Sequence, residues 1–222
     1  MESINYYGRG LSKANLEDYE GAIEDFTRAI ELDANNANLY NKRGYAKLYV
    51  SDRSASDDFI KGAEIVIAEC SKTIENDPTN SNAYCKRGQA KKQLAEYNEA
   101  KLDFSKAIEL DPNNSDLYLN RVLLIQETDD FQNFKDAISD CTKAIGLMDD
   151  KALGYCRRGD TKKMMKDFKG AIEDYSMAIN HAPTNHKYYF RRWTVRHIYG
   201  DLDGASEDMI KMEELTNNFE NI

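Results

Sequence analysis

An internal repeat of about 34 residues constrains the fold of this chain more than any other feature. Three segments of that length superpose without gaps, at residues 3–36, 81–114 and 152–185. Three further copies fit at residues 37–80, with ten extra residues, at 115–151, with three extra, and at 186–222. One repeat of this size buries too little apolar surface to be stable alone, so successive copies have to stack. The sequence therefore predicts a single repeat array over residues 3–222.

Each copy has the pattern of two helices joined by a turn. In residues 81–114, small and large apolar residues alternate, with Gly88 in the first half and Ala100 and Phe104 at four-residue spacing in the second. Proline stops a helix, because it lacks the backbone N–H and restricts the residue before it. All three prolines of the chain, Pro78, Pro112 and Pro183, stand at the end of a copy.

This unit resembles the tetratricopeptide repeat, with the best matches at Tyr84, Gly88, Ala100, Phe104 and Pro112. The resemblance implies an all-α fold, a right-handed α-solenoid of six helix–turn–helix units in one domain. It also implies a scaffold for protein–protein interaction whose concave face is lined by residues of the first helices. The carboxylate clamp of the members that bind Hsp70 or Hsp90 is matched at two of five places, so we do not expect those partners.

The overall charge of the chain limits the kinds of molecule that it is expected to bind. The chain has 222 residues, with 30 Lys and Arg against 39 Asp and Glu, a net charge of −9. An acidic protein is a poor candidate for binding nucleic acid, and no apolar run is long enough to cross a membrane. No catalytic, cofactor-binding or metal-binding motif is present, so we predict no enzyme, cofactor or metal. Four cysteines without a CxxC pair indicate reduced thiols and a cytoplasmic location.

Two series of charged residues recur once in every copy. An arginine precedes the small residue of each first helix, and an acid recurs in each second helix. The arginines are Arg9, Arg43, Arg87, Arg121, Arg158 and Arg192, and the acids are Asp25, Glu69, Asp103, Asp140, Asp174 and Asp208. Because the two series are equal in number, we expect structural ion pairs rather than a row of anion-binding arginines.

The resemblance also assigns the residues of the concave face. The positions carried over contain seven basic and three acidic residues, a sum of +4 within a chain of −9. A basic groove favours an acidic or extended peptide of a partner protein. The candidate peptide-binding residues are Tyr7, Asn38, Asn41, Lys42, Tyr45, Tyr49, Lys86, Gln89, Lys92, Asn120, Arg157, Lys163, Lys187 and Arg191.

Two other features have alternative interpretations. The extra residues of the second copy, placed at 50–62, would lengthen the turn between its helices, either as a solvated loop or as a lip over the groove. The last helix presents apolar residues, among them Met209 and Ile210, with no further helix to cover them. The alternative function is therefore a module that self-associates, forming a homodimer through its C-terminal end. Nucleic-acid binding along the basic residues is a third hypothesis, which the net charge disfavours.

Overall fold

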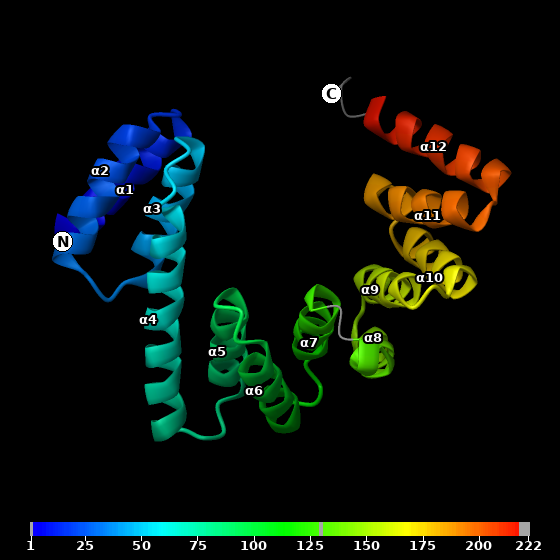
Figure 1. Ribbon diagram of the computed structural model, residues 1–222, viewed down its shortest axis with the longest axis horizontal. Coiled ribbons are helices and arrows are strands. Elements are labelled where there is room, and N and C mark those ends of the chain that lie inside the picture. The colour runs from blue at the N-terminus through cyan, green and yellow to red at the C-terminus, as the bar shows by residue number, and fades with distance from the viewer. Residues whose placement is uncertain (1, 129–130, 218–222) are drawn as a thin grey trace. The chain divides into compact units, whose positions relative to one another are not determined.

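The computed structural model describes residues 2–128 and 131–217 of the chain. These residues form twelve α-helices, one short 3₁₀ helix and no strand, so the predicted all-α fold is confirmed (Figure 1). The elements are α1 (Glu2–Asn15), α2 (Tyr19–Leu32), α3 (Ala37–Tyr49), α4 (Ala55–Asn76), α5 (Ser81–Gln93), α6 (Tyr97–Leu110), α7 (Ser115–Glu127), η1 (Phe131–Asn133), α8 (Phe134–Leu147), α9 (Ala152–Met164), α10 (Phe168–His181), α11 (His186–Tyr199) and α12 (Leu202–Asn217).

The chain divides into two compact units, Met1–Ala107 and Ile108–Ile222. In the first unit, each of the helices α1 to α4 packs on the next helix along the chain, and the same holds for α7 to α11 in the second. The twelve helices thus form six helix–turn–helix units in sequence order, as predicted. That residues 3–222 make one domain remains a prediction, and its residues 129–130 and 218–222 lie outside the described part of the chain.

Short polar segments set the ends of the helices. Pro78, Pro112 and Pro183 each lie two residues beyond the end of a helix. The asparagine that follows then caps the next helix, since its side-chain oxygen accepts a hydrogen bond from a backbone N–H of the first turn. Asn80 accepts from the N–H of Ala83 at 2.9 Å and Asn114 from that of Asp116 at 3.2 Å. The closing Pro and Asn of a copy therefore end one unit and begin the next.

The interior of each helix pair depends on a small residue facing an aromatic ring. A Cβ atom built on Gly88 would lie 2.9 Å from the ring of Phe104, and one built on Gly159 would lie 2.8 Å from the ring of Tyr175. Such distances are too short for any side chain, so glycine allows the two helices to approach closely.

The helix α4 is the main departure from the regular repeat (Figure 1). It has 22 residues, whereas the second helices α2, α6, α8 and α10 have 14 each. The prediction that the extra residues lengthen the turn at 50–62 is wrong, because only residues 50–54 separate α3 from α4. No loop of the second copy forms a lip, since the added residues extend the helix.

The position of the insertion follows from a comparison of the second and third copies. Residues 58–59 joined to residues 71–74 would read Asp-Phe-Ser-Lys-Thr-Ile, nearly the Asp-Phe-Ser-Lys-Ala-Ile of residues 103–108. The insertion is therefore the eleven residues Ile60–Cys70. Eleven residues make three helical turns to within about 20°, so α4 continues in phase for about 16 Å. One residue fewer before Asp58 accounts for the net gain of ten.

An arginine of each first helix binds an aspartate of its own second helix. The pairs are Arg9–Asp25, Arg43–Asp58, Arg87–Asp103, Arg121–Asp140, Arg158–Asp174 and Arg192–Asp208. In the last five pairs the Nη2–Oδ1 distance is 2.6–2.8 Å, and all six carboxylates are buried, with 1–5% of the residue exposed. The predicted ion-pair series is confirmed with one correction. The partner of Arg43 is Asp58, and Glu69 lies three turns further along α4.

Several of these arginines make further contacts that link neighbouring helix pairs. Arg87 also donates from Nη1 to the Ser71 hydroxyl of the preceding second helix at 3.2 Å, and Arg158 does the same to Thr142 at 3.1 Å. A second cation four residues later, such as Lys91, binds the same aspartate at 2.8 Å. The arginine series is therefore a structural framework, and its charge is neutralised within the fold.

Candidate functional site

All fourteen residues of the predicted peptide-binding face keep some solvent exposure. Nine lie in the first unit on α1, α3 and α5, and five lie in the second unit on α7, α9 and α11. Each unit therefore has a first-helix face of its own. That the two faces form one continuous groove remains a prediction.

Three tyrosines occupy the N-terminal part of the face in the first unit. The Tyr7 hydroxyl accepts a hydrogen bond from Asn38 Nδ2 at 2.9 Å. Tyr45 is more than half exposed and meets the Phe59 ring edge-on, with the centroids 5.0 Å apart. The ring of Tyr49 stacks on that of Tyr19 at 4.3 Å. These contacts hold the rings in place while leaving apolar surface exposed.

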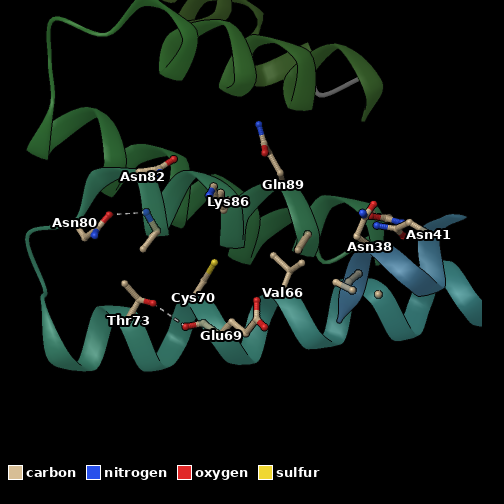
Figure 2. A pocket seen from close by; sticks show the side chains of 16 residues that line it. Asn38, Asn41, Val66, Glu69, Cys70, Thr73, Asn80, Asn82, Lys86 and Gln89 are labelled. Carbon is tan, nitrogen blue, oxygen red and sulfur yellow. Dashed lines mark hydrogen bonds between the residues drawn. The ribbon is translucent and has the colours of Figure 1, made fainter. Parts of the chain in front are cut away.

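A cavity of about 580 Å³ lies where α3, α4 and α5 meet (Figure 2). We call it the α4–α5 slot. It brings together four of the predicted face residues, Asn38 and Asn41 from α3 and Lys86 and Gln89 from α5. The residues that line it are Ala37, Asn38, Asn41, Gly62, Ala63, Val66, Glu69, Cys70, Thr73, Asn80, Asn82, Ala83, Lys86, Gln89, Ala90 and Gln93.

The slot exists because α4 is longer than its partner α3. The first residue of α3, Ala37, lies over Gly62, since a Cβ built on Gly62 would be 3.3 Å from the Ala37 carbonyl oxygen. Beyond Gly62, α4 runs on for another 14 residues, to Asn76. The first helix that packs on this second half is α5, whose Arg87 binds Ser71. The side of α4 that faces α3 in its first half therefore borders the slot in its second half.

The floor of the slot is apolar and its walls are polar. Val66 and Cys70 point from α4 toward α5 (Figure 2), and Ala63 follows Gly62, which meets Ala37 of α3. Burial raises the pKa of the Cys70 thiol, so this side chain is neutral and contributes to the apolar floor. Lys86 on the α5 wall and Glu69 on α4 form no ion pair within the described part of the chain. The slot thus offers one free charge of each sign.

One hydrogen-bonding group at the α3 end of the slot is unsatisfied. The side-chain oxygen of Asn41 is buried against Gly62 and has no partner within residues 2–128 and 131–217. Buried polar atoms are normally paired, and an unpaired one costs about 1–3 kcal/mol. The Asn41 oxygen can therefore accept a hydrogen bond from a ligand that enters the slot.

In the second unit, an internal contact changes the charge of the face. Arg191 Nη1 lies 2.6 Å from an oxygen of Asp160, which also accepts a hydrogen bond from the Tyr175 hydroxyl at 2.9 Å. Arg157 lies 3.8 Å from the other Asp160 oxygen. Burial and this carboxylate raise the pKa of Tyr175, which stays protonated and donates. Two arginines predicted to meet a peptide are therefore held by one buried aspartate.

The remaining predicted residues lie apart from the slot. The Asn120 side chain donates to the Asp116 carbonyl at 2.9 Å, and Lys187 borders a separate cavity beside α12. Lys42, Lys92 and Lys163 are half-buried on α3, α5 and α9. The slot residues that the sequence analysis missed include those of the insertion, Gly62, Ala63, Val66, Glu69 and Cys70. The near-repetition of residues 103–108 across the insertion was the available signal.

The described residues contain no cluster of three or more potential metal ligands. Among the helices described, none is both long and apolar enough to span a bilayer. All four cysteines are free and buried.

The described helix pairs define a helical-repeat protein. Two family models match, one described as "TPR repeat" over residues 6–48 and one as "Tetratricopeptide repeat" over residues 81–114. These two matches support a tetratricopeptide repeat protein, the family that the sequence resembles. Members of this family generally act as interaction scaffolds that bind protein partners, and not as enzymes.

Solved structures share the fold at low sequence identity. A crystal structure of MamA aligns with a TM-score of 0.64 and 22% identity, covering 77% of this chain and 96% of MamA. MamA from Desulfovibrio magneticus RS-1, residues 41 to the end, aligns with a TM-score of 0.62 and 18% identity, covering 82% and 96%. YrrB, described as a TPR protein with an unusual peptide-binding site, aligns with a TM-score of 0.53 and 18% identity, covering 86% and 91%. No curated protein sequence matches the chain.

Proposed function

We propose that this chain is an interaction scaffold that holds an acidic peptide segment of a partner protein against its first-helix face, with the α4–α5 slot at the centre of the site. The observation that carries the proposal is that Asn38, Asn41 and Lys86 border one cavity of about 580 Å³. YrrB, which shares the fold, has a peptide-binding site, and this supports the same use of the fold here. The proposal includes no catalysis, cofactor or metal, and the cytoplasmic location remains a prediction.

The chemistry of the slot fits a peptide ligand. Side-chain amides such as that of Asn38 both donate and accept, so they suit the polar groups of a peptide ligand. Lys86 is an exposed cation without an ion-pair partner in the described part of the chain, and it attracts a carboxylate. In the second unit Asp160 offsets the arginines, which makes the first unit the better site for an acidic ligand.

The experiment uses peptides selected from a displayed library of random sequences, with the full chain as bait. Selected peptides, resynthesised with a fluorescent label, should be acidic and should bind more weakly as salt is added. Substitution of Lys86 with glutamate should raise the Kd about tenfold or more, because it reverses the attraction and costs at least about 1.4 kcal/mol. Fluorescence anisotropy measures the Kd for the wild type and for the variant, and its dependence on salt.

The matched control makes the same charge change away from the slot. Lys169 is an exposed residue of α10, and Lys169→Glu should change the Kd less than about twofold. Equal losses in the two variants would indicate a general effect of net charge and would count against the site. An unchanged Kd in Lys86→Glu would do the same.

A second candidate function is self-association through α12. Met209 and Ile210 are 45% and 56% exposed, and Met209 borders a cavity of about 390 Å³ together with the exposed ring of Phe190. An apolar surface of this kind favours contact with a second copy. Sedimentation velocity should then show a dimer at about 100 μM that Ile210→Lys converts to a monomer. A wild-type monomer at that concentration would exclude this function.

A further inference from the structure

We infer that the α4–α5 slot receives a short amphipathic α-helix of the partner, about three turns long, which lies on α4 in line with α3. This inference rests on the proposed function and gives the bound segment a conformation. The sequence alone favoured an acidic or extended peptide, because the predicted first-helix face is mildly basic. The inference comes from what the insertion adds and what it leaves uncovered.

The insertion lengthens a second helix without adding a first helix to cover it. The side of α4 that packs on α3 includes Phe59 and Gly62, since Phe59 meets Gly44 and Gly62 meets Ala37. With the three- and four-residue spacing of a helical stripe, the same side continues through Val66, Cys70 and Thr73. All three of these residues border the slot. A surface that accepts a helix in its first half therefore continues, with the same geometry, into the slot.

The dimensions of the slot fit one short helix. The insertion adds about 16 Å to α4, which is the length of eleven helical residues. On the floor, Ala63 and Cys70 are buried, with 2% and 8% of the residue exposed, and Val66 between them is partly exposed. A side chain of this medium size allows a second helix to approach to the usual 8–10 Å between axes. The neighbouring wall of α5 then covers one flank of the bound helix, as the next first helix does in a regular repeat. A bound helix would complete the packing that α3 leaves unfinished.

The charges around the slot specify the chemistry of the partner helix. Its buried stripe should be aliphatic, with residues three and four apart, to cover Val66. The flank that faces α5 should carry an aspartate or glutamate that reaches Lys86, and the flank near Glu69 should carry a lysine or arginine. The bound part of the acidic segment is thus a short amphipathic helix with an apolar face and one charge of each sign beside that face.

The test uses peptides of 14 residues selected from a displayed library against the full chain, then labelled for anisotropy and NMR. We expect the selected sequences to carry aliphatic residues three and four apart and to show helical ¹³Cα shifts when bound. Val66→Arg should raise the Kd about tenfold or more. A proline in the middle of the peptide should do the same, because proline breaks a helix.

The matched control is Ala68→Arg, which places the same side chain two residues further along α4. Ala68 is exposed and borders a different cavity, so this variant should keep the Kd within about twofold of wild type. Circular dichroism of both variants checks that the chain is folded. Deletion of residues 60–70, which removes the slot altogether, should abolish binding and provides a second route if Val66→Arg does not fold.

The outcomes separate the two proposals. Peptides that lose affinity in Lys86→Glu, but not in Val66→Arg, and that tolerate the central proline would overturn the helix and leave the proposed function standing. Peptides whose affinity changes in none of the three, Lys86→Glu, Val66→Arg or the deletion, would overturn both. Loss of binding in Val66→Arg and with the central proline, but not in Ala68→Arg, supports the helix.

Discussion

Replacing Asp103 with alanine should lower the free energy of unfolding by about 3–5 kcal/mol, the cost of leaving buried cations without their counterion. Asp103 is 4% exposed and accepts from Arg87 at 2.9 and 2.7 Å, while Lys91 lies at 2.8 Å. The alanine variant leaves both cations beside an empty position, with only 19% and 17% of their side chains exposed. Urea denaturation at pH 7, followed by circular dichroism, measures the loss.

The same carboxylate gives the effect a defined dependence on pH. Burial works to raise the pKa of Asp103, but hydrogen bonds and charges from Arg87 and Lys91 outweigh it and hold the pKa below its ordinary value of 3.8. A carboxyl whose pKa is lowered by folding stabilises the protein above its unfolded pKa, and this stabilisation disappears as the pH falls through the folded pKa. The difference in stability between wild type and Asp103→Asn should therefore be constant above about pH 5 and shrink below about pH 4.

An exposed ion pair serves as the control. Lys61 and Glu64 lie 3.2 Å apart on α4 with about half of each side chain exposed, 52% and 53%. Glu64→Ala should cost less than about 1 kcal/mol, because water screens such pairs. If Asp103→Ala also cost less than about 1 kcal/mol, the ion-pair series would not be a main source of stability.

The periodic features of this fold could be predicted from the sequence, because each was repeated in several copies. The helix pairs, the prolines beyond their ends and five of the six ion-pair aspartates were predicted in this way, although Asp140 lies 19 rather than 16 residues after its arginine. The exception, Glu69, shows the limit of that reasoning. Since the insertion is three helical turns, Glu69 lies on nearly the same side of α4 as Asp58, and a helical pattern suits either acid. The structure selects Asp58 because the turn after α3 is short.

The candidate site was less predictable, because it depends on contacts that do not repeat. The slot arises from an insertion in a single copy, and its floor residues lie beyond the segment 50–62 in which the sequence analysis placed that insertion. The charge that the second unit offers to a ligand depends on Asp160. A sum of charges over the sequence counts Asp160 as −1, but it cannot show that Arg191 binds this carboxylate at 2.6 Å. The family resemblance assigned the first-helix face, but which of its side chains are free depends on neighbours from other helices.

Deleting residues 60–70 should leave the chain folded, whereas deleting residues 60–68 should not. Removal of eleven residues takes out three whole turns, so Ser71 follows Phe59 on nearly the same helix phase and can still accept from Arg87. Removal of nine residues rotates the rest of α4 by about 180°, which turns Ser71 and Ile74 away from α5. We expect a loss below about 2 kcal/mol for the first deletion and above about 4 kcal/mol for the second.

Thermal and urea denaturation of the two deletion variants measure this difference directly. The comparison isolates helix phase, because the variant that loses more residues is expected to be the more stable one. A chain that tolerated both deletions would show that α4 and α5 pack without a fixed register. The insertion of eleven residues would then not be needed to preserve the helix phase. A chain that tolerated neither would show that residues 60–70 are part of the core of the first unit. The expected result is that the eleven-residue deletion is folded and more stable than the nine-residue deletion. That result would show that the repeat is complete without residues 60–70, and that the role of these residues lies in the slot that they create.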